Sequence, residues 1–277
     1  MLIVRSVLFN LAWYANLLIQ MLVQAPLYPF LSRDRAEDVC NRWCFSNDPL
    51  QRALAGTDIE FQGLENRPDG PCIIACKHQS IWEFYAVHAR LVRPAYVLKA
   101  ELMKIPVFGW FVAKVDHIPI RRGERSKALK AMLREAKDRV DDGRSVIIFP
   151  EGTRKAPGAP ADYRYGVVRL YQELDIPVLP VALVSGLFWP RRKFLRHPGL
   201  LRVRMMPVIE PGMAADAFQE RLHDLIEWNT EDLYLETSLD PVRPPMDGAV
   251  EAAVERARAR RRERGMAVDA PAAGPIL

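Results

Sequence analysis

A single histidine stands between an apolar run and an acidic residue five positions further along the chain. Residues 72–76 are apolar, and Lys77-His78-Gln79-Ser80-Ile81-Trp82-Glu83 follows them directly. A histidine at a strand-to-helix junction has its ring on a loop, where imidazole can take a proton from an attacking alcohol near neutral pH. Glu83 can accept a hydrogen bond from the other ring nitrogen and fix its tautomer. The spacing therefore suggests a general base with an orienting carboxylate.

Glu83 also has a purely structural interpretation. Ser80 and Glu83 have the spacing of a capping box, in which the glutamate closes the start of a helix. The residues alone leave the catalytic and the capping interpretation open.

A second polar segment has the composition of a phosphate-binding turn. Phe149-Pro150-Glu151-Gly152-Thr153-Arg154 follows a predicted strand at Ser145–Phe149. Open α/β sheets bind ligands at the carboxyl ends of their strands. Arg154 can bind a phosphate through two parallel hydrogen bonds, and Gly152 allows the backbone to approach a ligand closely. We expect this turn to contact a substrate.

The two segments resemble motifs of the membrane glycerophospholipid acyltransferases, whose best-known members are the 1-acylglycerol-3-phosphate (lysophosphatidate) acyltransferases. The resemblance spans residues 55–210 and has four blocks in the family's order. These blocks are Lys77–Glu83, Ile118–Arg122, Phe149–Arg154 and Val178–Val181.

The resemblance implies transfer of a fatty acyl group from an acyl carrier protein or coenzyme A thioester to the free sn-2 hydroxyl of 1-acylglycerol-3-phosphate. The product would be phosphatidic acid, made during phospholipid synthesis. His78 would be the base and Glu83 its orienter, and neither a metal nor an organic cofactor is implied. The residues expected to bind substrate are Arg121, Arg122, Glu151, Gly152, Thr153 and Arg154.

Two positions depart from the family pattern. Glu83 stands where the family usually has aspartate, and its longer side chain can still reach an imidazole. Arg121-Arg122 stands where Asp-Arg is usual. Arg122 matches the family's phosphate-binding arginine, whereas the additional cation at Arg121 can change which headgroup is accepted. An acyltransferase for lyso-ornithine lipid or another lysophospholipid is therefore an alternative.

Two further alternatives change the chemistry. A hydrolase or thioesterase would use water in place of the alcohol, and a lipid-binding protein could keep the fold without catalysis. Cys76 lies two residues before His78, but a strand cysteine is more often a packing residue than a nucleophile. The four cysteines form no C-x-x-C pair, and we expect ordinary thiols in a reducing compartment.

Strand and helix patterns alternate after residue 33, which is typical of an α/β fold with a mixed, mostly parallel sheet covered by helices. The predicted strands are Asp58–Gln62, Cys72–Cys76, Ala95–Leu98, His117–Ile120, Ser145–Phe149, Val178–Leu183 and Leu201–Pro207. The predicted helices are Ile81–Leu91, Val107–Val112, Ser126–Asp141, Val167–Leu174 and Ala217–Leu235.

Residues 1–35 form a membrane-anchoring helical segment in this interpretation. No charged residue occurs from Ser6 to Ser32, and about 20 apolar residues cover a bilayer core. A polar stripe argues for a helix lying in the interface or embedded against its own protein, with a spanning helix and a buried core helix as alternatives. The stripe occupies an arc of roughly 140° and consists of Arg5, Ser6, Asn10, Trp13, Asn16, Gln20 and Gln24.

The net charge is +5, from 39 Lys and Arg against 34 Asp and Glu, which favours anionic partners. Residues 36–238 are expected to form the acyltransferase domain, and 239–277 a basic, disordered tail, with a frayed helix as the alternative. If the arginines of this tail bind a partner, anionic lipid headgroups are the natural one. No RNA- or DNA-binding motif is evident, so nucleic acid is not expected as a partner. The expected location is the cytoplasmic face of a bacterial inner membrane.

Overall fold

A seven-stranded sheet with the order β1-β7-β6-β2-β5-β3-β4 forms the centre of the protein. The computed structural model describes residues 1–91, 93–121, 125–271 and 274–276. Among these, only β6 and β7 pair antiparallel, so the predicted mixed, mostly parallel sheet is confirmed. The strands are β1 (Thr57–Gln62), β2 (Ile73–Cys76), β3 (Ala95–Lys99), β4 (Ile118–Ile120), β5 (Val146–Ile148), β6 (Val178–Leu183) and β7 (Gly199–Met205).

The position of β2 between β5 and β6 brings the two sequence motifs together. β2 and β5 run parallel, with Ala75 paired with Ile148, so their carboxyl ends meet at one edge of the sheet. These central strands are rich in Val and Ile because both of their faces are buried. The loops that follow them carry His78 and residues 149–154.

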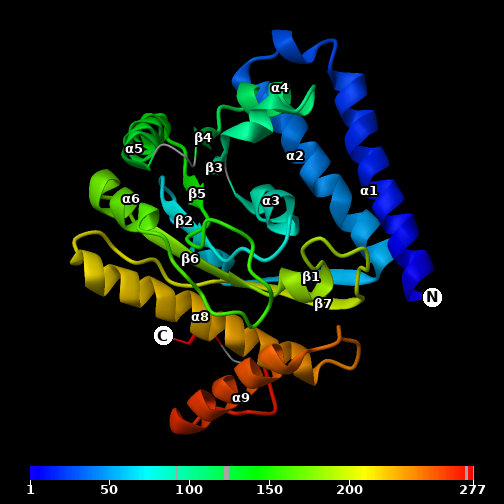
Figure 1. Ribbon diagram of the computed structural model, residues 1–277, viewed down its shortest axis with the longest axis vertical. Coiled ribbons are helices and arrows are strands. Elements are labelled where there is room, and N and C mark those ends of the chain that lie inside the picture. The colour runs from blue at the N-terminus through cyan, green and yellow to red at the C-terminus, as the bar shows by residue number, and fades with distance from the viewer. Residues whose placement is uncertain (92, 122–124, 272–273, 277) are drawn as a thin grey trace.

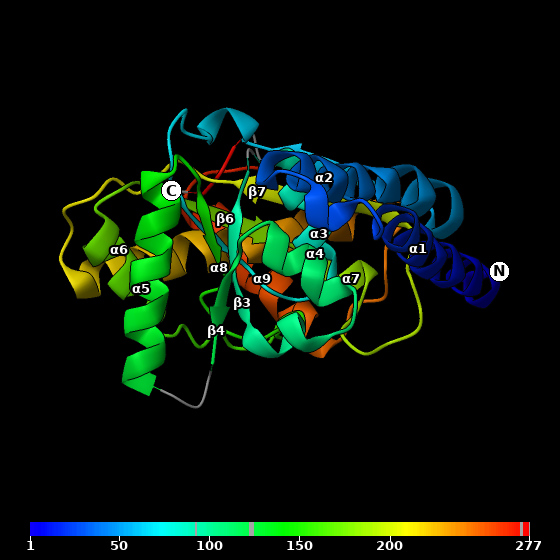
Figure 2. The same ribbon diagram turned by 90° about the horizontal axis from the view of Figure 1, so that it is seen from above.

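Helices cover both faces of the sheet, and each predicted strand and helix overlaps an observed one. α8 packs on β6 and β7, while α5 packs on β3, β4 and β5 and lies beside α6. α5 and α6 occupy the end of the molecule opposite α1 and α2 (Figures 1 and 2). The helices of this domain are α3 (Trp82–Ala86), α4 (Phe108–Lys114), α5 (Arg125–Asp141), α6 (Gly166–Leu174), α7 (Ser185–Phe188) and α8 (Ala215–Leu239).

Helix α2 (Arg33–Leu50) was not predicted. It packs beside α1 (Leu2–Gln24) and continues into a π-helical turn at Gln51–Ala55. Its buried positions include Glu37 and Asn47 as well as apolar residues, so it lacks the clear apolar stripe by which a surface helix is recognised.

The polar stripe of α1 faces the protein, as one of the two favoured interpretations requires. Ser6 Oγ accepts a hydrogen bond from the Arg196 amide at 2.9 Å, and Asn10 Nδ2 donates to the Phe194 carbonyl at 3.0 Å. Asn16 Nδ2 donates to Ser46 Oγ on α2 at 2.9 Å. These contacts run along most of the helix and dock it against the domain.

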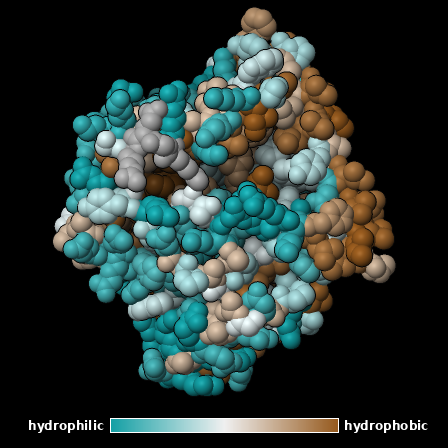
Figure 3. Space-filling view, in the orientation of Figure 1, coloured by the Kyte–Doolittle hydropathy of each residue, from teal (hydrophilic) through white to brown (hydrophobic). Residues whose placement is uncertain are grey.

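The opposite face of α1 is exposed and apolar. Its leucine, isoleucine and valine side chains form a brown surface at the right of the molecule, where Figure 1 draws α1 (Figure 3). By length and composition this helix could cross a membrane, but only 17% of its most apolar window is buried in the protein, so it is not a core helix. The most exposed members of this surface are Ile3, Val4, Leu11, Leu18, Ile19, Leu22 and Val23.

The expectation of a disordered tail from residue 239 is wrong for α9 (Gly248–Glu263), which packs on α8. Arg261 of α9 is fully buried between Asp232 and Glu236 of α8. The arginine run signalled a solvated segment because sequence alone does not reveal that α8 buries two carboxylates, which Arg261 shares with Arg204 of β7.

Candidate active site

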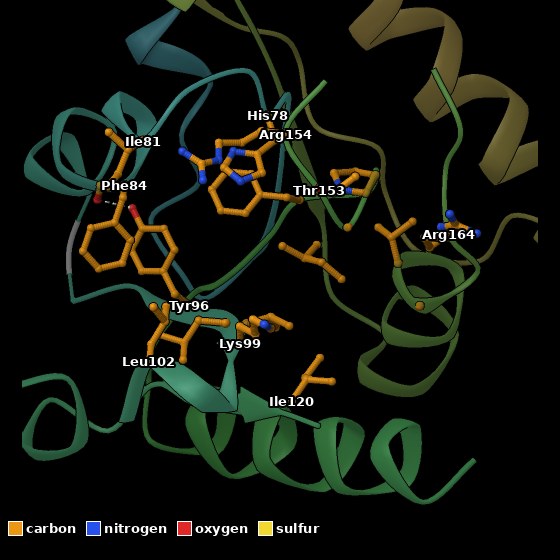
Figure 4. Close-up of a pocket in the computed structure, with 18 of the residues that line it drawn as sticks. His78, Ile81, Phe84, Tyr96, Lys99, Leu102, Ile120, Thr153, Arg154 and Arg164 are labelled. Carbon is orange, nitrogen blue, oxygen red and sulfur yellow. Dashed lines mark hydrogen bonds between the residues drawn. The ribbon is translucent and has the colours of Figure 1, made fainter. Parts of the chain in front are cut away.

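A pocket of about 550 Å³ lies at the edge of the sheet where β2, β3 and β5 end. His78, Thr153 and Arg154 line one end of it, and Lys99, Leu102 and Ile120 face them from across the cavity (Figure 4). Most of the remaining wall is apolar or aromatic. The pocket can therefore hold a lipid chain next to a small polar centre.

The His78 ring lies directly against the 149–154 turn. It stacks on Phe149 with ring centroids 3.9 Å apart and an angle of 19° between the rings. The His78 carbonyl also accepts a hydrogen bond of 2.9 Å from the Lys155 amide. The side chain is 18% exposed, so the imidazole is held firmly but remains accessible from the pocket.

Glu83 fits both interpretations drawn from the sequence. Its Oε1 accepts hydrogen bonds from the backbone amides of Gln79 at 2.9 Å and Ser80 at 2.8 Å, which is the capping role. Ser185 Oγ donates to the same oxygen. Its Oε2 lies 3.7 Å from His78 Nδ1, which has no hydrogen-bond partner among the described residues. This separation exceeds a hydrogen bond, but catalytic contacts commonly tighten when substrate binds.

Arg154 points toward the imidazole in the pocket (Figure 4). Burial, followed by the nearby Arg191, lowers the pKa of the Arg154 guanidinium, whereas Glu83 opposes this shift. A cation in such surroundings gains from an anionic ligand. Gly152 has a φ of +63°, a left-handed conformation that favours glycine and explains this residue in the turn.

Two predicted substrate-binding residues, Glu151 and Arg121, lie outside the described pocket wall, and the position of a third is not described. Glu151 is 1% exposed and contacts Lys77 and the His78 amide, so its carboxylate supports the loop and is not part of the described pocket wall. Arg121 is exposed beyond β4, next to the lining residue Ile120, and is itself absent from the described lining. Arg122 lies outside the described residues.

Three lining cations, Lys99, Arg164 and Arg191, are not among the residues predicted to bind substrate. Lys99 lies at the carboxyl end of β3, and this position was the available signal for its inclusion. Arg164 also lines the pocket, although it lies ten residues beyond Arg154 in an irregular segment with no motif. Arg164 pairs with Asp162 at 3.0 Å.

A second, smaller cavity of about 60 Å³ adjoins the pocket. It shares Phe84, Phe108 and Val112 with the pocket wall and extends toward Leu17 and Met21 of α1. The shared side chains lie between the pocket and the inner face of the N-terminal helices.

The cysteines show no sign of nucleophilic or metal-binding use. All four are free, and burial raises the pKa of the Cys76 thiol well above its usual value, which opposes thiolate formation. In the part of the chain that the structure describes, no three or more His, Cys, Asp or Glu side chains could together hold a metal ion.

Comparison with known proteins agrees with the motifs and the fold. Residues 58–184 match the family model described as Acyltransferase. The chain is 36% identical over 216 residues to the 1-acyl-sn-glycerol-3-phosphate acyltransferase of Pseudomonas aeruginosa, covering 77% of this chain and 82% of that protein. It is 28% identical to a 1-acyl-sn-glycerol-3-phosphate acyltransferase of Chlamydomonas reinhardtii, with coverage of 77% and 65%.

The fold is also shared with a solved structure. The 1-acyl-sn-glycerophosphate acyltransferase of Thermotoga maritima superimposes with a TM-score of 0.70 at 21% identity, over 84% of this chain and 98% of that one. The match to the Pseudomonas protein over most of both chains decides the family. This chain belongs to the 1-acyl-sn-glycerol-3-phosphate acyltransferase family.

Proposed function

We propose that the protein transfers a fatty acyl group from a thioester to the sn-2 hydroxyl of 1-acylglycerol-3-phosphate, giving phosphatidic acid. The observation that carries this proposal is that His78 and Arg154 line one end of a pocket whose remaining wall is mostly apolar. A base, an anion-binding cation and a lipid-sized cavity are the parts that this reaction needs.

His78 acts as the general base. Nε2 of its imidazole takes the proton of the acceptor hydroxyl while that oxygen attacks the thioester carbonyl. The carbon–sulfur bond then breaks, and the proton passes to the departing thiolate. Glu83 beside Nδ1 stabilises the imidazolium formed in between. A thioester is already activated, so the reaction needs no acyl-enzyme and uses no metal or organic cofactor.

Arg154 and Lys99 bind the acceptor phosphate from two sides of the pocket. The resemblance adds Arg122 to this group, as a prediction. The acyl donor is coenzyme A or acyl carrier protein, and its chain runs along the apolar wall toward the smaller cavity. The side chains of Leu17 and Met21, which line that cavity, would set the preferred chain length.

The exposed face of α1 attaches the protein to a bilayer, at the cytoplasmic face of a bacterial inner membrane. Because the polar stripe of α1 is engaged with the domain, this geometry favours a helix embedded along the membrane surface. The double variant Leu18→Asp/Leu22→Asp should be released from sedimented vesicles, whereas Val242→Asp, at another exposed apolar position, should stay bound. Equal retention of both variants would refute this attachment.

A donor and acceptor assay tests the proposed reaction. Purified protein in vesicles is given an acyl thioester with lysophosphatidate, with lyso-ornithine lipid, with lysophosphatidylcholine or with no acceptor. The proposal expects phosphatidic acid from lysophosphatidate at the highest kcat/KM. A higher value with another lysolipid would select the alternative acceptor, for which the additional cation of Arg121 is the sequence argument. Thioester cleavage that ignores every acceptor would indicate a hydrolase.

A further inference from the structure

A buried lysine directly before His78 contacts a carboxylate of α8. Lys77 is 3% exposed, and its Nζ lies 2.8 Å from both carboxylate oxygens of Glu227. Nζ also lies 3.0 Å from Oε1 of Glu151. The ammonium group of Lys77 thus links the turn after β5 to helix α8, which lies far beyond both sequence motifs along the chain.

This charge cluster extends to the backbone of the catalytic residue. Oε2 of Glu151 accepts a hydrogen bond of 3.2 Å from the His78 amide. Burial raises the pKa of Glu151, and the charge of Lys77 opposes this shift. Tyr163 donates a hydrogen bond of 2.7 Å to Glu227, which helps to stabilise the negative charge of the Glu227 carboxylate. Removing Glu227 would therefore disturb every member of a cluster that ends on His78.

The residue directly after His78 has its own contact with α8. Gln79 is 1% exposed, and its Nε2 donates to the Tyr234 hydroxyl at 2.6 Å. The same hydroxyl accepts from the Gly158 amide at 3.3 Å, and Oε1 of Gln79 accepts from the Gly186 amide at 3.0 Å. The Gln79 side chain thereby fixes its place between α8 and α7.

Glu227 and Tyr234 share one face of α8 because seven residues make nearly two full helical turns. From that face they hold the two residues that flank His78. α8 also packs on β6, the neighbour of β2 in the sheet, so its position is tied to the strand that leads into the catalytic loop.

We propose that Glu227 and Tyr234 are positioning residues that fix the orientation of His78 through Lys77 and Gln79. Both lie outside the region 58–184 that matches the acyltransferase family model. The inference rests on the proposed role of His78 as the base. A general base must be held within a fraction of an ångström, and a displacement of about 1 Å can cost roughly 100-fold in rate.

Glu227→Gln tests this in the full-length protein in vesicles, with lysophosphatidate and a long-chain acyl-CoA. It keeps the size of the side chain and removes its charge. We expect kcat to fall about tenfold or more while the KM values for donor and acceptor stay within about twofold. Tyr234→Phe, which removes only the hydroxyl, should act in the same direction. Glu220→Gln is the matched control, because Glu220 is exposed on α8 seven residues earlier.

A second substitution separates positioning from simple loss of stability. Lys77→Met leaves the buried carboxylate of Glu151 and the partly buried carboxylate of Glu227 without their cation. Adding Glu227→Gln removes one of these charges, so Lys77→Met/Glu227→Gln should be several-fold more active than Lys77→Met. A double variant no more active than Lys77→Met, or a wild-type kcat in Glu227→Gln, would overturn the proposal.

Hydrogen exchange tests the positioning without reference to turnover. Glu227→Gln should accelerate exchange of the amides of residues 77–80 while the thermal midpoint changes little. Unchanged protection there would overturn the inference even if activity fell. If wild-type protein showed no acyl transfer but this exchange effect appeared, the proposed function would fail while the contact from α8 to the His78 loop would stand.

Discussion

One oxygen of Glu83 lies 3.7 Å from Nδ1 of His78, while the other accepts hydrogen bonds from the amides of Gln79 and Ser80. The cap fixes a carboxylate that must stay near the imidazole. The structural and the catalytic interpretation of Glu83 therefore describe one arrangement, in which the start of α3 holds the orienting group.

Glu83→Gln should lower kcat about 100-fold with little loss of stability. The amide oxygen can still accept from Gln79 and Ser80, but an N–H group then faces His78 Nδ1 and favours the tautomer that cannot accept a proton at Nε2. Glu83→Asp should be tolerated better, because it keeps the charge and loses one methylene. Steady-state kinetics on both variants decide this. Near-normal turnover of Glu83→Gln would show that the cap is its whole role.

The sequence motifs predicted this centre because their chemistry is local. His78, Glu83 and Arg154 are recognisable from residue types and short spacings, and adjacent parallel strands bring their loops together. Glu151 belongs to the same motif as Arg154, yet its carboxylate contacts Lys77 instead of lining the pocket. Which way a turn residue points depends on partners distant in sequence, here Glu227, and no local pattern contains that information.

Arg154→Gln should raise the KM for lysophosphatidate about 10- to 100-fold and change the donor KM little. A charge-assisted, two-pronged hydrogen bond to phosphate contributes about 1.5–3 kcal/mol, which corresponds to this range. Arg221→Gln, at an exposed position of α8, serves as the control. An equal rise in both KM values would argue against a specific acceptor phosphate site.

Leu17→Trp should shift the donor preference toward shorter acyl chains. Leu17 lines the small cavity that adjoins the pocket, so a larger side chain there shortens the space for the chain end. Leu18→Trp is the matched control, because Leu18 is 56% exposed on the outer face of the same helix. Competition between acyl-CoA species of different length measures the shift. The same preference in both variants would place the chain end elsewhere.

His88 should make the protein less stable in acid. Its ring is buried in the wall of the smaller cavity with no hydrogen-bond partner among the described residues, and burial, followed by Arg144, lowers its pKa from 6.5 to about 4. The unfolded chain therefore binds more protons between these values, so the free energy of unfolding falls as the pH drops from 6.5 toward 4.

When the pH is lowered from 7.5 to 4.5, the free energy of unfolding should fall in both proteins. We expect the fall to be about 2 kcal/mol smaller in His88→Phe than in wild type. Urea unfolding in detergent at several pH values measures the difference. Parallel pH profiles for the two proteins would show that His88 is not buried in its neutral form.

The two N-terminal helices differ in how well sequence patterns predict them. The polar stripe of α1 could be predicted because its polar residues recur with helical period in an otherwise apolar run. Helix α2 could not be predicted, because it buries Glu37 and Asn47. Their partners, such as Arg144 and Asn16, come close only in the folded chain. α9 was misread for the same reason, since Arg261 looks solvated until Asp232 is placed beside it.

The role of His78 as general base is tested most directly by acyl transfer from acyl-CoA to lysophosphatidate by His78→Ala in vesicles, compared with wild type at equal amounts of folded protein. We expect a loss of kcat of about 100- to 10,000-fold, with unchanged circular dichroism and thermal midpoint. Folded His78→Ala that forms phosphatidic acid at close to the wild-type rate would contradict it.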